Sequence, residues 1–220
     1  IKAKPHIGTD NLRNVVKNIR ERIISLGGEV RFGAKLCDFS IKNREINKVK
    51  TENDELNASA LVLAIGHSAR DTFELLVKNG IYLEPKPFSV GARIEHPQDR
   101  VDESLYGEYA KNPLLPVGEY QLSYRENDRA AYTFCMCPGG YVVNASSEQG
   151  RVAVNGMSNS KRDSGYANSA IVVSVSPNDY EDKHPLAGMY YQQKLEQKTA
   201  EYCNGMIPVQ YWLDFLQHTR

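Results

Sequence analysis

Apolar residues near the start of the chain recur at intervals of three and four, with arginine, lysine and asparagine between them. This spacing puts the apolar side chains on one face and predicts an amphipathic helix. The apolar positions are Leu12, Val15, Val16, Ile19, Ile23 and Leu26. Thr9 or Asp10 can cap the first turn, and the glycine pair at 27–28 can end the helix, because glycine tolerates a left-handed C-terminal turn.

Three short segments with strand character come next and predict a small meander. They are 29–32, 36–41 and 46–51. Ala60–Ile65 is an unbroken apolar run, which predicts a strand covered on both faces inside a layered sheet. Gly66 ends this strand, and Ser68 or Asp71 can cap a helix that runs to Gly80. This first part of the chain is therefore expected to form an α/β half-domain.

A cluster of prolines begins near Glu84 and marks a boundary followed by a loop-rich crossing. Beyond it, five short β-like stretches are separated by Gly, Asn, Asp and Ser, which predicts a mostly antiparallel sheet. These stretches are 121–124, 130–134, 141–145, 152–154 and 171–175. Helical composition returns at 186–203 and at 211–216. The predicted fold class is α/β plus α+β.

The charge balance excludes some classes of partner. Lysine and arginine total 27, as do aspartate and glutamate, so the whole chain lacks the electrostatic signal of a nucleic-acid or anionic-membrane binder. The longest apolar run has six residues, against the ~20 of a membrane-spanning helix, and no charged-then-apolar leader stands at the start. Four cysteines are too few for a disulfide scaffold of this length. We expect reduced thiols and a soluble, cytoplasmic protein without nucleic-acid or membrane partners.

Two motifs carry candidate chemistry. Leu61–Ser68 ends an apolar strand in a glycine turn, where a nucleotide could approach backbone amides at the carboxyl edge of a sheet. A core strand followed by a helix-entry glycine explains the same residues. Cys135 and Cys137 are spaced for a redox pair or for half of a soft-metal site, and Pro-Gly-Gly follows them. On an alternating strand both would point to one face, where two small packed hydrophobes are the simpler alternative.

Small polar groups gather at Asn155–Ser158, Arg162–Asp163 and Asn168–Ala170, as in loops that recognise ligands or as in ordinary turns. The five histidines show no metal-ligand spacing and no hydrolase triad order. The glycines form neither G-x-G-x-x-G between a strand and a helix nor a P-loop. We therefore expect the main phosphate-binding loop of any nucleotide site to lie outside this sequence.

Five segments taken together point to one family. They are Lys4–Asp10, Leu63–Thr72, Lys86–Phe88 with Gly91–Pro97, Phe134–Gly140 and Asn155–Ser158. With them the chain resembles, over nearly its whole length, the uncharacterised bacterial FAD-dependent dehydrogenases, also described as NAD(FAD)-utilising dehydrogenases. The resemblance implies a Rossmann-like, glutathione-reductase-type FAD-binding domain that is split by an inserted substrate domain.

On this resemblance, 1–85 and 181–220 would be a partial FAD-binding domain and 86–180 the inserted, mostly antiparallel β substrate domain. Because the chain begins at Ile1 without methionine and lacks the phosphate loop, we expect a central fragment of a longer FAD-dependent oxidoreductase. The fragment alone is expected to bind FAD weakly or not at all, because the missing loop supplies the anion site at a helix N-terminus.

The resemblance also implies roles for the cofactor site. Leu36 resembles the place where such flavoproteins pair backbone groups with the adenine. Ala64, Ile65 and Gly66 resemble the strand and turn that pass the adenosine and pyrophosphate. Recognition there uses main-chain groups, so residue identity matters through size and backbone angles.

Catalytic and substrate-binding roles are assigned as hypotheses. Cys135 and Cys137 are candidates for groups near the isoalloxazine ring. Arg93 and Arg162 are candidates for holding an anionic substrate or a cofactor phosphate by bidentate hydrogen bonds, with surface ion pairs as the alternative. The partners would be a small-molecule substrate, with NAD(P)H as a candidate electron donor, and no metal site is predicted.

Two other functions fit the same sequence. The first is a non-catalytic scaffold or binding domain that keeps the flavoprotein architecture without cofactor, because no clear acid–base constellation is present. The second is a thiol-redox or metal protein that uses Cys135 and Cys137. The sequence names neither the substrate nor the electron acceptor.

Overall fold

The computed structural model describes residues 5–180 and 182–219. Internal contacts divide the chain into two compact units. The sheet unit holds the described residues of 1–14, 86–181 and 190–220, and the meander unit holds those of 15–85 and 182–189. The boundary between Pro85 and Lys86 lies where the proline cluster begins.

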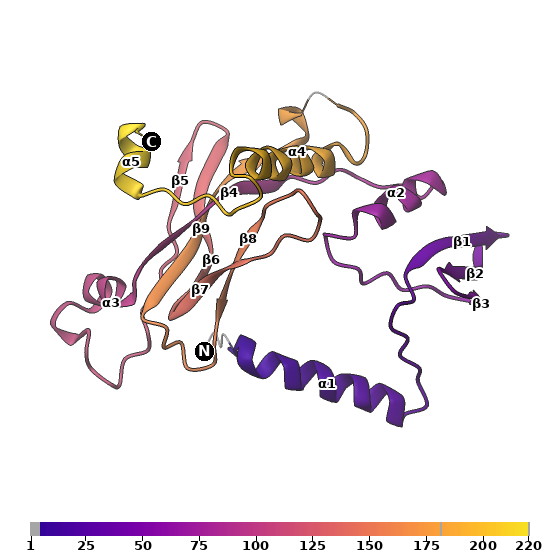
Figure 1. Ribbon diagram of the computed structural model, residues 1–220, viewed down its shortest axis with the longest axis horizontal. Helices are drawn as coiled ribbons and strands as arrows, with labels where there is room; N and C mark the ends of the chain where they lie inside the picture. The colour runs from indigo at the N-terminus through magenta and orange to yellow at the C-terminus, as the bar shows by residue number, and fades with distance from the viewer. Residues whose placement is uncertain (1–4, 181, 220) are drawn as a thin grey trace. The chain divides into compact units, whose positions relative to one another are not determined.

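An antiparallel sheet with the strand order β4-β9-β6-β5 forms the centre of the sheet unit (Figure 1). Its strands are β4 (Phe88–Pro97), β5 (Ser123–Glu126), β6 (Arg129–Cys137) and β9 (Tyr166–Val175). The pairing of β4 with β9 is unbroken from Phe88↔Val175 to Pro97↔Tyr166. A separate hairpin joins β7 (Gly140–Asn144) to β8 (Val154–Ser158). The predicted mostly antiparallel architecture is confirmed for this unit.

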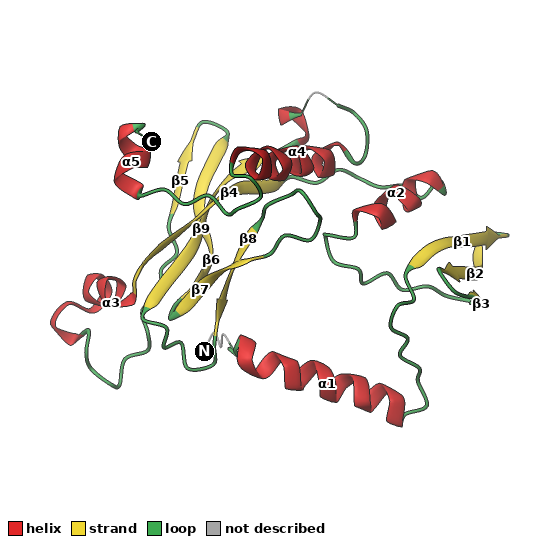
Figure 2. Cartoon of the chain, viewed as in Figure 1, coloured by secondary structure: helices red, strands yellow, loops and turns green. Residues whose placement is uncertain are grey.

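Helices connect these strands or lie beside them (Figure 2). They are α3 (Gln98–Tyr106), η1 (Gly107–Tyr109), η2 (Pro177–Asp179), α4 (Ala187–Tyr202) and α5 (Trp212–Gln217). Both α4 and α5 lie where helical composition predicted them. The stretch after Glu84, predicted as a loop-rich crossing, instead contains β4 and α3. Pro87 precedes β4 and Pro97 ends it, where a missing backbone N–H does least harm, while Pro113 and Pro116 lie in the loop after η1.

Small apolar residues and one aromatic cluster form the core of the sheet unit. The buried apolar positions of this unit include Val101, Val152, Ala167, Val172, Val175 and Ala200. Phe88 at the start of β4 lies 6.3 Å from Tyr180 and 6.2 Å from Tyr191 between ring centroids. Such pairs contribute ~0.5–1.5 kcal/mol each beyond the area that they bury. The cluster therefore packs Tyr180 and Tyr191 against the start of β4.

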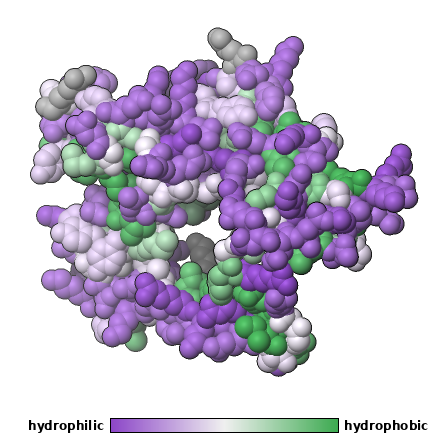
Figure 3. Space-filling model, turned by 45° about the vertical axis from the view of Figure 1, so that its right-hand side comes forward, coloured by the Kyte–Doolittle hydropathy of each residue, from purple (hydrophilic) through white to green (hydrophobic). Residues whose placement is uncertain are grey.

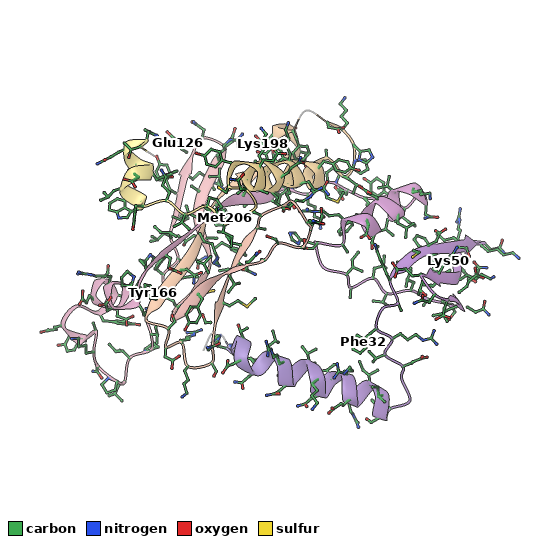
Figure 4. The ribbon with its side chains drawn as sticks, viewed as in Figure 1. Phe32, Lys50, Glu126, Tyr166, Lys198 and Met206 are labelled. Atoms are coloured by element: carbon green, nitrogen blue, oxygen red, sulfur yellow. The ribbon has the colours of Figure 1, made fainter. Side chains whose placement is uncertain are left out.

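The meander unit contains a three-stranded antiparallel sheet in the order β1-β2-β3. Its strands are β1 (Leu36–Lys42), β2 (Glu45–Thr51) and β3 (Glu55–Asn57), and the helix α2 (Arg70–Lys78) follows. The first two strands and α2 match the predicted segments. The predicted strand at 29–32 is wrong, because these residues form a loop in which Phe32 is 77% exposed (Figure 4).

The predicted buried strand at Ala60–Ile65 is also wrong. The segment belongs to none of the described sheets, and the side chain of Val62 is 87% exposed. A strand that buries both faces needs hydrogen-bonded neighbours and covering layers, and the meander supplies neither. A Rossmann-like arrangement is accordingly absent from the described residues of this unit.

The helix α1 (Thr9–Ser25) runs as the apolar spacing predicts, and Gly27 follows with φ +85°. No residue of α1 is buried, and several of its large apolar side chains are among those left exposed. Figure 3 shows hydrophobic residues, in green, on the surface of the molecule. None of the helices in the described part of the chain is both long enough and apolar enough to cross a membrane.

Candidate functional site

Four of the five segments that carry the family resemblance meet within the sheet unit. They are His6–Asp10, Gly91–Pro97, Phe134–Gly140 and Asn155–Ser158. The site lies toward the end of the sheet that Tyr166 marks in Figure 4, where β6 ends and β9 begins, and away from the turn at Glu126. Three of the predicted residues, Arg93, Cys135 and Cys137, are in contact there, and Arg162 lies beside them.

Arg93 on β4 is the centre of the site. Its Nη1 and Nη2 donate to the carbonyl oxygen of Cys135 at 3.2 and 2.7 Å, and Nη1 also donates to Oδ1 of Asn168 at 3.1 Å. Nη2 lies 4.0 Å from Sγ of Cys137. These acceptors are all neutral, so the half-buried guanidinium is held in place without a carboxylate among the described residues.

A β-bulge shapes the strand that carries the two cysteines. The pairing of β6 with β9 shifts between Phe134 and Cys137, and Cys135 has φ +46°. Because the bulge adds a residue to β6, the predicted regular alternation, with both thiols on one face, is wrong. The bulge instead presents the carbonyl of Cys135 to Arg93, leaving Cys135 exposed and Cys137 half-buried.

Both cysteines are free thiols, and their surroundings favour the neutral form of Cys137. Burial raises the pKa of Cys137, while the Arg93 guanidinium and the Ser158 hydroxyl act in the opposite direction. A thiol reacts as a nucleophile or binds metal through its thiolate, so this environment disfavours both roles at neutral pH. Within residues 5–180 and 182–219, no group of three or more His, Cys, Asp or Glu residues is arranged to hold a metal ion.

Asn168 supports Arg93 from the neighbouring strand. It lies in β9 and not in a loop as predicted, and its side chain is fully buried, with Nδ2 lacking a hydrogen-bond partner. Gly156 on β8 lies directly against both groups, since a Cβ there would come within 2.6 Å of the Arg93 guanidinium and collide with Oδ1 of Asn168. The glycine therefore allows the backbone to cover the arginine.

Arg162 lies beside the Pro-Gly-Gly turn. Its Nη1 is 3.9 Å from Oε2 of Glu119, and its carbonyl packs against Gly139, where a Cβ would collide with it. Gly139 has φ +52°, a backbone conformation that glycine adopts without strain. Arg162 contributes positive potential at Cys137 but already faces a carboxylate. Of the two predicted arginines, Arg93 is the one without an acidic partner.

The residues His6–Asp10, here named the N-terminal strap, are bound to the end of β8. His6 Nε2 pairs with the carbonyl of Asn159 at 2.9 Å, and Thr9 donates to that of Ser158 at 3.2 Å. Asp10 accepts from the backbone N–H and hydroxyl of Ser160 at 2.8 and 2.7 Å. The two predicted helix caps therefore use their side chains to fasten the strap, and Gly8 provides the carbonyl for the first turn.

The side chain of Gln98 holds the Pro-Gly-Gly turn through hydrogen bonds. Its Oε1 accepts from the backbone N–H of Gly139 at 2.9 Å, and its Nε2 donates to Asp102 and to the carbonyl of Gly118. Ser158 adds a hydrogen bond to the carbonyl of Pro138 at 3.0 Å. Sequence reasoning missed Gln98, since a lone glutamine after a proline carries no signal. It missed the role of Asn168 because the strand was predicted to begin at Ile171, whereas β9 begins at Tyr166.

A second polar pair lies on the other face of the sheet. His96 on β4 stacks on Tyr120 at 5.6 Å between ring centroids, and its buried Nε2 has no partner. Burial lowers the pKa of His96 and raises that of Tyr120, whose hydroxyl bonds to Ser169. Both side chains are therefore uncharged near neutral pH, and neither was singled out from the sequence.

The predicted cofactor residues lie in the meander unit, on two separate segments. Leu36 begins β1 and lines a shallow groove of about 490 Å³ between that strand and α2. Ala64, Ile65 and Gly66 lie in the extended segment before α2. No sheet pairing among the described residues joins the two regions, and Gly66 has φ +66° with open space around it.

Comparison with known proteins assigns the larger part of this chain to a family of FAD-dependent proteins. The family model for "FAD-dependent protein, C-terminal domain-like" matches residues 87–220, more than half of the chain. The chain belongs to this family. It is also 44% identical, over 219 residues, to an uncharacterised protein of Clostridium beijerinckii, with 98% of this chain covered. The chain spans 41% of the length of that relative.

Proposed function

We propose that this chain is the central region of an FAD-dependent oxidoreductase of the dehydrogenase type, and that its sheet unit carries the substrate site. The membership in an FAD-dependent family supports the cofactor. The observation that carries the proposal is the convergence of four separate motif segments on Arg93 and the Phe134–Gly140 turn. Packing alone would not need a guanidinium held by neutral acceptors.

The cofactor would be held in part by the first 85 residues. Ala64–Gly66 offer exposed backbone groups and a left-handed turn in open space, and Leu36 lines a groove, which fits the binding of an adenine nucleotide by main-chain contacts. FAD, when bound, would supply hydride or electron transfer. Residues 1–85 and 181–220 would then contribute the meander unit and its neighbouring segments to a glutathione-reductase-type domain, whose Rossmann-like parallel sheet and phosphate loop the described residues do not include.

The residues of the sheet unit would orient a small-molecule substrate and exclude water. Arg93 supplies fixed positive charge, and Asn168 and the Cys135 carbonyl prevent it from swinging away. Cys137 provides a neutral thiol beside it and not a thiolate nucleophile. Gln98 and the N-terminal strap hold the Gly139 turn and the end of β8 in fixed positions. NAD(P)H is the proposed electron donor, in the cytoplasm.

The test uses the intact protein that contains this chain, purified without added flavin. We expect a yellow protein with a flavin absorbance band and a stoichiometric FAD content. Gly66→Val should lower the FAD content, because a β-branched side chain at φ +66° would displace the turn. Gly33→Val is the matched control, with φ +62° and equally open surroundings in the same unit.

A folded but colourless intact protein would overturn the cofactor and favour the non-catalytic scaffold. Equal flavin loss in the Gly66→Val and Gly33→Val proteins would show that Gly66 has no special part in binding. The 220-residue chain alone should bind FAD weakly or not at all, and a micromolar Kd measured by titration would contradict that expectation.

A further inference from the structure

The charge of Arg93 is not neutralised within the site. Its hydrogen-bond acceptors are a carbonyl, a carboxamide and a thiol, and no ion pair involves it in the described part of the chain. A half-buried guanidinium usually gains a carboxylate or phosphate, because neutral acceptors do not offset the cost of removing a charge from water. The sheet unit therefore holds a cation that lacks its anion.

The geometry of the guanidinium shows which edge is free. Nη1 and Nη2 together grip the carbonyl of Cys135, and the remaining side of Nη1 faces Asn168. The edge formed by Nε and Nη2 meets only Sγ of Cys137, at 4.0 Å from Nη2. Two parallel N–H groups on one edge are the arrangement that binds a carboxylate in bidentate fashion. That edge is unoccupied by any protein acceptor of comparable strength.

We infer that the Nε–Nη2 edge of Arg93, beside Cys137, binds the carboxylate of a small organic acid substrate. This inference rests on the proposed function and adds the substrate class. A planar group with two oxygens and one negative charge matches one guanidinium edge. A phosphate ester would call for more positive charge, and the nearby Arg162 already faces Glu119.

The site is also built to keep that edge in one orientation. Gly156 covers the guanidinium, Asn168 is fully buried against it, and the β-bulge fixes the carbonyl that holds its end. A pre-positioned arginine loses little side-chain entropy when the anion binds. The bulge and Gly156 therefore serve to position the guanidinium, and neither is a reacting group.

Arginine side-chain NMR of the 220-residue chain tests the inference. Acetate and benzoate are titrated against sodium chloride of equal ionic strength while the ¹H–¹⁵N signal of the Arg93 Nε–H is followed. We expect a saturable shift of that signal, with a Kd on the order of millimolar. Arg93→Lys, in which binding is followed through the backbone amide signals near the bulge, should weaken benzoate binding by about tenfold or more, because lysine cannot form the fork.

Arg125→Lys on β5 is the matched control, since Arg125 is exposed and distant in the pairing from the bulge, and it should bind benzoate as the parent does. A second variant, Asn168→Asp, places a competing carboxylate next to the guanidinium and should also weaken benzoate binding. If acetate and benzoate shift the Arg93 Nε–H signal no more than sodium chloride does at the same ionic strength, the inference is overturned. Undiminished binding by a folded Arg93→Lys protein would overturn it as well.

The outcomes for flavin and for the carboxylate are separable, because the titration needs no cofactor. A colourless intact protein whose Arg93 still binds benzoate would end the proposed oxidoreductase function and leave the anion site. A yellow intact protein with no specific benzoate shift would keep the function and end the carboxylate assignment.

Discussion

Arg93 on β4 donates from Nη1 to Oδ1 of the fully buried Asn168 on β9, at 3.1 Å. The oxygen of the Asn168 carboxamide accepts a hydrogen bond from the guanidinium, while the nitrogen of the same carboxamide, Nδ2, has no hydrogen-bond partner. A buried amide with an unpaired donor destabilises the fold by ~1–3 kcal/mol. The unpaired Nδ2 of Asn168 therefore lowers the stability of the fold at the place where the four motif segments meet.

Asn168→Asp should show how much the contact between residue 168 and Arg93 contributes to stability. The new carboxylate would face Arg93, so we expect its folded-state pKa to lie below the ~3.9 of an unfolded aspartate. The stabilisation from that pair should be present above about pH 4 and lost as the pH falls through the folded pKa. Urea unfolding at pH 7 and pH 3 measures this, and a stability difference from the parent that is equal at both values would contradict it.

Gly139→Ala should be among the most destabilising glycine substitutions in the sheet unit. An L-residue at φ +52° costs ~1–2 kcal/mol, and its Cβ would also collide with the carbonyl of Arg162. We expect a total loss of about 3 kcal/mol in the free energy of unfolding. Gly150→Ala, at φ +73° with open space around it, isolates the backbone contribution and should cost only about 1 kcal/mol. Equal losses would show that the Arg162 contact is unimportant.

The strap should respond to acid through Asp10. Hydrogen bonds from the hydroxyl and backbone N–H of Ser160 lower the pKa of Asp10 below its usual 3.8. The stabilisation that the ionised Asp10 gives to the contact between the N-terminal strap and Ser160 is therefore present above that pH, and it is lost as the pH falls through the lowered pKa. In Ser160→Ala the hydroxyl bond is removed and the backbone bond stays, so the pKa should rise part of the way back. Carboxyl ¹³C NMR titration measures both proteins, and an unchanged pKa would contradict the contact.

The two thiols of the bulge should differ in reactivity. Because burial raises the pKa of Cys137, iodoacetamide at pH 8 should modify it more slowly than the exposed Cys135. Arg93→Met removes a charge that favours the thiolate and should slow Cys137 further, whereas Arg93→Lys should keep the rate near that of the parent. Peptide mass spectrometry resolves the two sites. Faster modification of Cys137 than of Cys135 would show that a thiolate is present.

The same raised pKa predicts a small loss of stability in alkali. The unfolded chain would release the Cys137 proton near the ordinary thiol pKa of ~8.5, before the folded chain does. The stability linked to this group is therefore full below that pH and declines above it. Cys137→Ser should reduce this part of the decline between pH 8 and pH 10 in urea unfolding, and an identical slope in both proteins would exclude the linkage.

Local patterns were sufficient for much of the fold. The three-and-four spacing correctly predicted α1, and short strand-like stretches bounded by turn residues placed β1, β2, β6 and β7 close to their observed positions, together with the second half of β9. Helical composition likewise placed α4 and α5. The periodicity and turn residues that predict these elements are contained in each segment, although the strands themselves pair with distant ones.

Other features depended on contacts that no segment encodes by itself. The apolar run at Ala60–Ile65 has the composition of a buried strand but lacks hydrogen-bonded neighbours, so composition misled there. The bulge at Cys135 arises where β6 must pair with β9 and still present its carbonyl to Arg93. A shift of this kind reverses which face a side chain occupies, and alternation alone does not reveal it.

The sequence by itself determined the chemistry available at the site, because it contains Arg93, a cysteine pair and a Pro-Gly-Gly turn within the motifs that resemble one family, with Arg162 shortly after them. Tertiary structure decided which of them act together. It paired Arg162 with Glu119 and left Arg93 with neutral acceptors, and it brought Asn168 from a distant strand against the guanidinium. The physical reason is that charge compensation and burial depend on neighbours in space, which only strand pairing and the bulge establish.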